Sequence, residues 1–464
     1  MTFRGLIFIV IDAFLALLAL YSAALERFGY SEAIEKLHKT ETIYVSAIFV
    51  LVILFSSHLM ETYDFSKNTK KSEIIINILF DTITSFALLS IIYYLYPDVI
   101  LGRGVLILSL ILFTLYQYFW HTIFLIGKNS PRFSTRVMVL GTGALAAQIG
   151  NLASSNNRNF VLAGYTSCKN NSTKGNKSED SNLILPQDSI IAGSDDLLAA
   201  TLQARADIIV VALAEKRGVF PLTDVLRCKL NGIEIMEAPT FYELVHNKLM
   251  LENITPSWLI YSLGFRRTNL FNVCKRAIDI LMSAAGLLLT MPLFPVIALA
   301  IKLDSPGPVL YKQLRVGKKE KLFTLYKFRT MRFDAEKQTG AKWATKNDPR
   351  VTKLGRFFRE SRIDEIPQLI NVMKGEMSFI GPRPERPEFV EKLKLVIPYY
   401  SERHFINPGL TGWAQVMYPY GASVEDTIEK LRYDLYYIKN IRPFLDTLIL
   451  FETIKVVLFG RGGR

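Results

Sequence analysis

The sequence predicts a membrane protein of mixed α and α/β class, with apolar helices first and two α/β units after them. Half of the 464 residues are hydrophobic, a high share for a water-soluble chain. Four apolar stretches fill the first quarter, strand-like and helical runs alternate after them, and a proline-broken apolar run opens the last part. The length alone allows two to four units.

The first quarter is expected to form four transmembrane helices within residues 1–130. Each apolar stretch is near the roughly 20 residues that cross a bilayer as a helix. The first stretch has no small-residue cleavage site and is followed by further spans, so we expect it to be retained. Buried helices of a soluble protein are the alternative. The stretches cover about 5–25, 43–60, 75–95 and 104–127.

Lysine and arginine are distributed unevenly around these stretches. They are frequent in the loop at 61–73 and after the fourth stretch, whereas the loop at 26–42 carries more acids than bases. The positive-inside rule therefore places both ends of the bundle in the cytoplasm. The basic residues are Lys67, Lys70, Lys71, Lys128, Arg132 and Arg136.

The whole chain is basic, with a net charge of +13. This charge fits anionic lipid headgroups or phosphorylated substrates, and no nucleic-acid-binding signature accompanies it, so no nucleic acid partner is expected. The three cysteines and five histidines are scattered. Their spacing predicts no zinc or iron–sulfur site and no disulfide framework.

The stretch "RVMVLGTGALA" (136–146) is an apolar strand that runs into Gly141-x-Gly143-x-x-Ala146. Further strand-like runs follow, so we predict a doubly wound, Rossmann-like domain over 131–255. A dinucleotide site needs an acid at the end of the second strand to hold the ribose. That place reads Gly164–Ser167 without an acid. We therefore expect a structural or regulatory domain rather than one that binds NAD.

The third unit, 268–464, begins with an apolar run at 275–303 that Pro292 and Pro295 interrupt. Proline removes a helix hydrogen bond, so we expect a break. A helix that crossed the membrane would place the lysine- and arginine-rich remainder outside. We therefore favour a re-entrant helix that turns back at Pro292, with the third unit at the cytoplasmic membrane face.

The stretch "RIDEIPQLINVMKGEMSFIGPRPE" (362–385) places Asp364 and Glu365 side by side. Pro367 predicts a helix start and Gly375 predicts its end. Two carboxylates at this position could hold one divalent cation and leave one oxygen free to attack a substrate. The alternative is structural, with Asp364 as a helix N-cap.

Arginines surround the two acids in the sequence. Arginine binds phosphate oxygens in bidentate fashion, and Mg²⁺ combines few carboxylates with phosphate oxygens. The pattern is therefore what a phosphate ester together with a metal would need, and the structural alternative stays open at this point. The arginines are Arg356, Arg359, Arg362, Arg383 and Arg386.

From about residue 272 onward, the chain resembles the bacterial sugar transferases, which are monotopic polyprenyl-phosphate phosphoglycosyl transferases. The resemblance rests on "KRAIDI", the proline-broken helix, "GPVLYKQLRVGKKEKLFTLYKFRTM", "DPRVTKLGRFFRESRIDEIPQLINVMKGEMSFIGPRPERPEF" and "NPGLTGWAQV". With four spans and a Rossmann-like domain, the chain is similar to the large initiating enzymes of exopolysaccharide assembly.

The resemblance implies transfer of a phosphosugar from a UDP-sugar to undecaprenyl phosphate, with release of UMP. Asp364 matches the nucleophile that forms a covalent phosphosugar intermediate, and Glu365 matches the Mg²⁺ ligand. Arg359 and Arg383 match phosphate-binding positions. Pro292 matches the break of the re-entrant helix, although Met291 stands where the family usually has serine.

Lys327 and Arg329 in "YKFRT" are further candidates to bind substrate phosphate; a basic strand on lipid headgroups is the alternative. The resemblance also implies the bacterial inner (cytoplasmic) membrane, with membrane lipids as partners. A homodimer is compatible with the sequence. The donor sugar is not readable, and a UDP-hexose such as UDP-glucose or UDP-galactose is our expectation.

Two other functions would account for parts of this sequence. A membrane-bound nucleotide-sugar dehydratase or epimerase needs NAD and a Tyr-x-x-x-Lys pair, and the only such spacing found is Tyr63–Lys67, before the glycine motif. A non-catalytic polysaccharide assembly factor would not need the acids and arginines, all of which are present.

Overall fold

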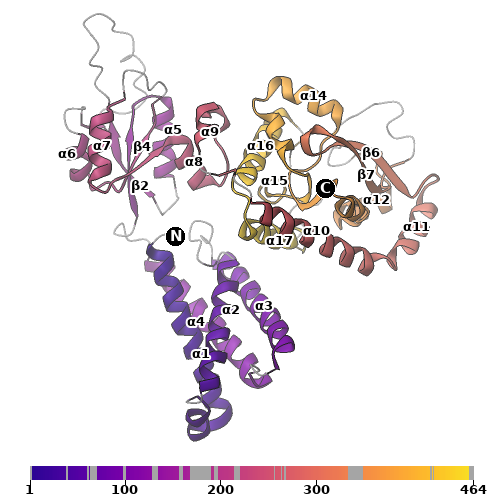
Figure 1. Cartoon of the computed structure of the whole chain (residues 1–464), viewed down its shortest axis with the longest axis horizontal. Coiled ribbons are helices and arrows are strands. Elements are labelled where there is room, and N and C mark those ends of the chain that lie inside the picture. Colours follow the sequence, from indigo (N-terminus) through magenta and orange to yellow (C-terminus); the bar gives the residue numbers. More distant parts are fainter. Residues whose placement is uncertain are drawn as a thin grey trace, which may run out of the picture. The chain divides into compact units, whose positions relative to one another are not determined.

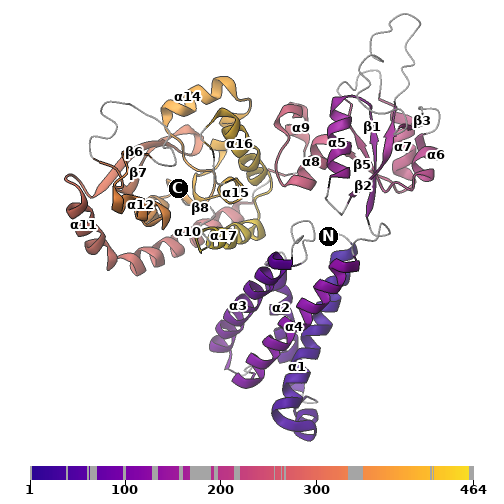
Figure 2. The same cartoon turned by 180° about the vertical axis from the view of Figure 1, so that it is seen from behind.

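The computed structural model divides into two compact units, Met1–Phe241 and Tyr242–Arg464, and each is described by itself (Figures 1 and 2). Residues 168–183, for which the polar sequence predicts a surface loop, lie outside the described residues. The structure describes residues 3–37, 40–59, 62, 71–97, 101–127, 134–155, 160–167, 190–192, 197–213, 220–254, 256–262, 264–265, 268–332, 348–418, 421 and 423–458.

The first unit begins with four long helices: α1 (Phe3–Leu37), α2 (Thr40–Leu59), α3 (Lys71–Leu95) and α4 (Arg103–Gly127). By length and composition, three described segments could cross a membrane: Phe8–Gly29, Asn77–Leu95 and Arg103–Phe124. The described apolar part of α2, Ile43–His58, is shorter. These helices are those of a membrane protein, and the number of four spans stays a prediction.

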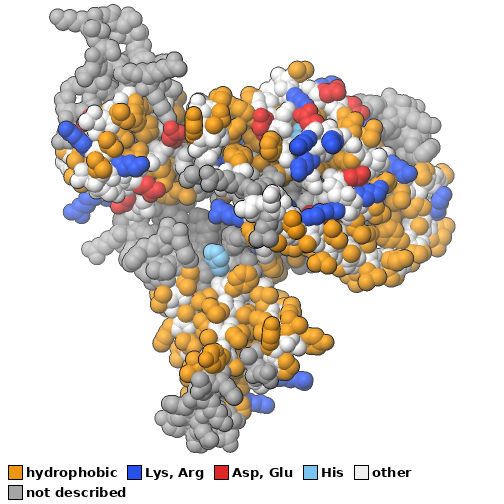
Figure 3. All heavy atoms as spheres, viewed as in Figure 1, with side chains coloured by type: hydrophobic (Ala, Val, Ile, Leu, Met, Phe, Trp, Pro, Cys, Tyr) orange, Lys and Arg blue, Asp and Glu red, His pale blue; other side chains and the backbone are white. Residues whose placement is uncertain are grey.

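Helix α1 packs against the other three helices partly through small side chains. Ala16, Ala19 and Ala23 of α1 are fully buried, and small residues allow helix backbones to approach closely in a bilayer. Large apolar side chains cover the outer surface instead (Figure 3). Phe14 and Phe119 are both more than half exposed. Apolar side chains on the outer surface of these helices need no protein partner if that surface faces lipid.

A five-stranded parallel sheet follows, in the order β3-β2-β1-β4-β5. Figure 1 shows α6 and α7 on one side of this sheet and α5 on the other. The predicted α/β class is therefore correct. The elements are β1 (Thr135–Leu140), α5 (Ala144–Ser154), β2 (Phe160–Thr166), β3 (Ile190–Ala192), α6 (Leu197–Gln203), β4 (Ile208–Val211), α7 (Leu222–Leu230), β5 (Glu234–Glu237) and α8 (Ala238–His246).

Gly141, the first glycine of the motif, has a structural reason to be glycine. Its φ is +134°, and a Cβ atom there would lie 2.6 Å from the carbonyl oxygen of Ala212. The motif therefore lets the turn after β1 approach the chain that leaves β4. This packing role does not require a bound dinucleotide.

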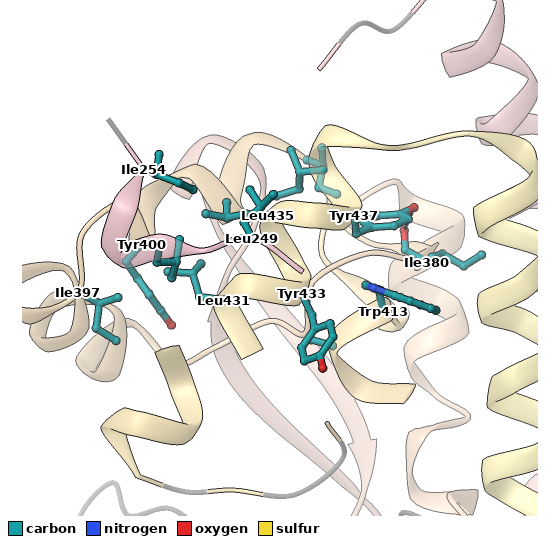
Figure 4. Close-up of a cluster of buried hydrophobic side chains, with 14 of the residues drawn as sticks. Leu249, Ile254, Ile380, Ile397, Tyr400, Trp413, Leu431, Tyr433, Leu435 and Tyr437 are labelled. Carbon is teal, nitrogen blue, oxygen red and sulfur yellow. Dashed lines mark hydrogen bonds between the residues drawn. The ribbon is translucent and has the colours of Figure 1, made fainter. Parts of the chain in front are cut away.

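After the end of α8, the second unit continues with η6 (Leu251–Asn253) and α9 (Pro256–Tyr261). A hydrophobic core joins this opening segment to residues of later elements (Figure 4). Leu249, Ile254 and Trp258 belong to this core, together with Trp413 and Tyr437. The later helices are α12 (Lys353–Glu360), α13 (Gln368–Lys374), α14 (Pro387–Val396), α15 (Trp413–Met417), α16 (Val424–Lys439) and α17 (Pro443–Leu458).

Two small sheets complete this unit. β6 (Leu310–Val316) pairs antiparallel with β7 (Leu322–Phe328), and β8 (Ser378–Ile380) pairs in parallel with β9 (Gly409–Thr411). Three short 3₁₀ turns connect the elements: η7 (Lys318–Glu320), η8 (Ile363–Glu365) and η9 (Tyr400–Phe405).

The expected helix break is present. α10 (Asn269–Thr290) and α11 (Leu293–Asp304) meet at an angle of 63° around Met291 and Pro292. Phe294 N donates to Met291 O across the bend. Apolar side chains at the bend are exposed, including Leu289 at 80% and Met291 at 68%. Figure 3 shows hydrophobic side chains over this region.

The inner face of α10 is polar and holds the helix to the rest of the unit. Arg276 donates from Nη1 to Val372 O and from Nη2 to Met373 O, each over 2.6 Å. Asp279 is buried and accepts from Phe379 N and from Ser378 Oγ. α10 thereby contacts the C-terminal end of α13, whose N-terminal side carries the two acids.

Candidate active site

Asp364 and Glu365 lie on η8, a single 3₁₀ turn between α12 and α13. The predicted limits of the next helix are correct, because α13 starts after Pro367 and ends at Gly375, whose φ is +84°. Its N-cap residue is Pro367, and no side chain caps it. Asp364 therefore does not act as the N-cap of α13.

Glu365 is buried and surrounded by cations. Its Oε1 accepts from Arg383 Nη2 at 2.7 Å and from Lys327 Nζ at 3.0 Å, and Arg362 Nη1 lies 3.6 Å from Oε2. Burial opposes ionisation of this carboxyl, but the three cations outweigh burial and hold its pKa well below the usual range. Glu365 is therefore an ionised carboxylate at neutral pH.

Asp364 has a different environment, although it is the adjacent residue. It is also buried, and Lys327 Nζ lies 3.8 Å from its Oδ2. Burial raises the pKa of Asp364, and the neighbouring charge of Glu365 adds to this effect, while Lys327 opposes it. The pair thus combines one fixed anion with one carboxyl that is less strongly neutralised.

The Gly-Pro-Arg-Pro segment holds Arg383 in place beside these acids. Gly381 N donates to Thr411 O, and a Cβ atom on Gly381 would lie 2.4 Å from Asn407 O. Arg315 Nη1 donates to Pro384 O over 2.9 Å. The segment is therefore packed into the unit by backbone contacts and is more than an exposed turn.

Two further residues, which the sequence did not indicate, support the same segment. Arg403 Nη2 donates to Arg383 O over 3.0 Å and forms an ion pair with Asp434 Oδ2 at 2.8 Å. Both side chains are buried, and Arg403 Nη1 also donates to Tyr400 Oη. Asp434 lies on α16, 51 positions from Arg383, so no local pattern could have revealed it.

The remaining candidates lie at different distances from the acids. Arg359, in the last turn of α12, donates from Nε to Thr330 Oγ1 over 3.0 Å, and its charge acts on Asp364. Arg329 instead donates from Nη2 to Ser305 O at the C-terminal end of α11. Pro292 lies at the bend between α10 and α11. The structure thus brings Lys327, Arg359 and Arg383 to the acids.

The donor set bears on the expected metal. Among the described residues, no group of three or more His, Cys, Asp or Glu side chains is arranged to hold a metal ion. Mg²⁺ commonly takes one or two carboxylates and completes its shell with phosphate oxygens and water. Asp364 and Glu365 fit such a shared site, in which the substrate supplies the other ligands.

Comparison with known proteins agrees with this arrangement. Residues 270–460 match the family model described as bacterial sugar transferase. The chain therefore belongs to the bacterial sugar transferase family.

One relative is a UDP-N-acetylgalactosamine-undecaprenyl-phosphate N-acetylgalactosaminephosphotransferase of Aeromonas hydrophila. It is 42% identical to this chain over 238 residues, which are 51% of this chain and 55% of that protein. A UDP-glucose:undecaprenyl-phosphate glucose-1-phosphate transferase of Escherichia coli is 40% identical over 217 residues, 46% of each chain. The exopolysaccharide production protein PSS of Rhizobium leguminosarum is 42% identical over 187 residues, 39% of this chain and 94% of that protein. The chain thus spans about half the length of the first two.

Proposed function

We propose that this protein transfers a phosphosugar from a UDP-sugar to undecaprenyl phosphate and releases UMP. The observation that carries the proposal is the pair of adjacent buried carboxyls with opposite pKa shifts, beside Lys327 and Arg383. The names of the Aeromonas and Escherichia relatives include undecaprenyl phosphate, which supports this acceptor. Such a reaction is the first membrane step of exopolysaccharide assembly.

Asp364 is the nucleophile in this proposal. One oxygen of its carboxylate attacks the phosphorus that carries the sugar, and the bond from that phosphorus to the bridging oxygen of the diphosphate breaks. The electron pair of the broken bond leaves with UMP, and the phosphosugar stays on Asp364 as an acyl phosphate. An oxygen of undecaprenyl phosphate then attacks the same phosphorus and restores the carboxylate.

Four cations have roles in the two steps of this reaction. Arg383 and Lys327 stabilise negative charge on the oxygens of the phosphate under attack and on the leaving UMP. Arg359 contacts a phosphate of the UDP-sugar. Arg329 is buried, and its Nε and Nη1 have no hydrogen-bond partner within the described part of the chain. Unused buried donors support a phosphate-binding role, and we assign Arg329 to the acceptor phosphate.

Mg²⁺ would be held by Glu365, with Asp364 beside it. When bound, it would neutralise charge on the diphosphate and on the leaving phosphate. Glu365 suits this role because it is ionised and immobilised by Arg383 and Arg362. Lys327 contacts both acids and keeps their charges compensated.

The membrane arrangement follows from the broken helix. We propose that α10 and α11 form a re-entrant hairpin whose bend at Pro292 lies in the hydrocarbon, with the site on the cytoplasmic face of the inner membrane. The exposed apolar bend and the polar inner face of α10 support this topology. In this proposal, the predicted four spans and the Rossmann-like domain take part in no step of the reaction.

The test is UMP release by lipid-embedded protein with Mg²⁺, with and without undecaprenyl phosphate. The donor panel includes UDP-glucose and UDP-galactose, our expected hexoses, and UDP-N-acetylgalactosamine, because the relatives' names divide between glucose and N-acetylgalactosamine. Release that requires one sugar and disappears in Asp364→Asn supports the proposal. Release that persists in Asp364→Asn contradicts it.

The same panel separates the two other functions. An epimerase or dehydratase would convert the sugar and release no UMP. The Tyr63–Lys67 pair that this function would need lies outside the described residues. An assembly factor would neither release UMP nor respond to Asp364→Asn.

A further inference from the structure

The chain between the two acids and Arg383 forms a hairpin whose ends meet at the site. After Glu365 it continues through α13, turns at Gly375 and returns along β8, and Arg383 follows three positions after β8. The ends meet where Arg383 Nη2 donates to Glu365 Oε1 over 2.7 Å. We call this segment, residues 364–383, the site hairpin, with α13 as its outgoing limb and β8 as its return limb. Helix α10 contacts both limbs.

Arg276 of α10 binds the outgoing limb at its C-terminal end. Its guanidinium donates from Nη1 to Val372 O and from Nη2 to Met373 O, each over 2.6 Å. The last carbonyl groups of a helix have no partner within the helix and carry partial negative charge, so a cation with two donors suits them. Gly375 leaves room for this contact, since a Cβ atom there would lie only 3.3 Å from Arg276 Nη2. The end of α13 is therefore fixed to α10.

Asp279 of α10 binds the return limb. Its side chain is buried, and its Oδ1 accepts from Phe379 N over 3.0 Å and from Ser378 Oγ over 3.2 Å. The amide of Ser378 instead donates to Pro408 O, next to β9. Successive amides of a strand point to opposite edges, so Asp279 supplies an acceptor at the edge of β8 that β9 leaves open. The return limb is therefore fixed between α10 and β9.

The two contacts come from neighbouring positions on one face of α10. Residues three positions apart on a helix are neighbours, so Arg276 and Asp279 keep a fixed separation. The same face continues to Gly286, where a Cβ atom would lie 3.0 Å from Leu369 Cδ1 in the first turn of α13. The opposite face exposes apolar side chains, such as Leu281 at 70%. α10 therefore lies along the site hairpin with its polar face.

We propose that α10 is the template that sets the distance between Arg383 and the acids, with Arg276 and Asp279 as positioning residues. Arg276 holds the limb that carries the acids, Asp279 holds the limb that leads to Arg383, and one helix keeps the two contacts at a constant separation. The opening of the site hairpin is thereby fixed. This inference rests on the proposed function, in which Arg383 binds the reacting phosphate. It gives the helix that we place in the lipid a part in the geometry of the reaction.

The alternative role of the two residues is attachment of α10 alone. Loss of an attachment lowers the amount of folded protein, and this effect does not depend on whether Arg383 is present. Loss of a positioning contact acts on the reaction through Arg383, so it has little further effect once Arg383 is replaced. A double-mutant cycle measures this difference, because coupled residues give non-additive effects.

The cycle combines Asp279→Leu with Arg383→Gln in the full-length protein in lipid and measures kcat for UMP release. Asp279→Leu alone should lower kcat by about 10–10²-fold, since displacing a catalytic group by about 1 Å has effects of this size. In the Arg383→Gln background, the same change should lower kcat by less than about twofold. Asp279→Asn retains an oxygen that accepts from Phe379 N, so it should restore most of the activity.

Two control variants complete the cycle. Ser283, on the same face of α10, donates only to the carbonyl oxygens of Asp279 and Ile280 within the described part of the chain, so Ser283→Ala should keep the wild-type kcat. Ile254→Ala opens a cavity in the core and lowers the folded fraction, and its effect should be the same in both backgrounds. If Asp279→Leu does not fold, Arg276→Gln takes its place in the cycle with the same expectation.

Hydrogen exchange of the full-length protein in lipid tests the positioning independently of the reaction. Asp279→Leu should increase amide exchange over residues 378–383, whereas Ser283→Ala should not. If the wild type releases no UMP from any donor, the proposed function fails, and exchange over this segment still decides the positioning. Unchanged exchange in Asp279→Leu overturns the inference, as does a loss of kcat that is equal with and without Arg383→Gln.

Discussion

The guanidinium of Arg383 donates from Nη2 to Oε1 of Glu365 over 2.7 Å and joins the Gly-Pro-Arg-Pro segment to the turn that carries both acids. Lys327, from β7, contacts the same oxygen at 3.0 Å. This contact explains why two adjacent buried carboxyls have opposite pKa shifts, since the cations gather on Glu365 and leave Asp364 less strongly neutralised.

Arg383→Gln should lower kcat/KM for UMP release by about 10²–10³-fold, because it removes a charged donor from the reacting phosphate. The matched control is Arg356→Gln, an exposed arginine on α12, which should stay within about twofold of wild type because removing an exposed charge has little effect. Steady-state kinetics of both purified variants give the comparison. Equal activity of the two variants would show that Arg383 does not bind the reacting phosphate.

Lys327→Met should move the acid limb of the pH–rate profile to higher pH. Asp364 reacts as a carboxylate, and burial already raises its pKa while Lys327 lowers it. Without Lys327 the pKa rises further, so activity is lost at a higher pH as the solution is acidified. Lys321→Met, an exposed lysine just before β7, should keep the wild-type profile. An unshifted acid limb in Lys327→Met would contradict this account.

Asp434→Asn should reduce both stability and activity. It leaves the Arg403 guanidinium buried without its carboxylate, a loss of about 3–5 kcal/mol for a broken buried pair. Arg403 also supports the backbone of Arg383, so kcat should fall even at temperatures where the variant is folded. Glu425→Gln, an exposed acid on the same helix, is the control. A folded Asp434→Asn with wild-type kcat would show that Arg403 does not position Arg383.

His404 should make stability depend on pH. Burial lowers its pKa from 6.5 to about 4, so the folded state stays neutral where the unfolded state binds a proton. The unfolding free energy contributed by His404 therefore falls as the pH drops from about 6.5 to about 4, by up to about 3 kcal/mol.

The buried carboxyl of Asp434 acts in the opposite sense, because burial raises its pKa to about 6 and the folded state then gains a proton first on acidification. The melting temperature of wild type relative to His404→Gln isolates the histidine. This difference should decrease from neutral pH to about pH 4. Parallel acid destabilisation of both proteins would exclude His404 as the cause.

Local patterns in the sequence predicted a large part of this structure. Proline and glycine have strong backbone preferences, so Pro367 and Gly375 correctly marked the ends of α13, and Pro292 marked the bend. The glycine motif with its alternating runs predicted the parallel sheet. Each of these signals lies within a few residues of the feature that it predicts.

The remaining features depend on contacts between distant parts of the chain. The sequence brought no signal for the Arg403–Asp434 pair or for the contact of Asp279 with β8, because single polar residues within apolar or amphipathic runs have no characteristic spacing. It also grouped Arg329 with Lys327, because side chains two positions apart in a strand share a face. β7 ends at Phe328, however, so Arg329 lies beyond the strand. Arg329 contacts the end of α11, and Lys327 contacts the acids.

The measurement that tests the central claim most directly uses a UDP-sugar labelled in the phosphate next to the sugar. The label is added to lipid-embedded protein without acceptor, and protein-bound label is counted before and after addition of undecaprenyl phosphate. The account predicts label on the wild type that the acceptor removes, and no label on Asp364→Asn. Equal labelling of Asp364→Asn, or UMP release without any labelled protein, would contradict Asp364 as the nucleophile.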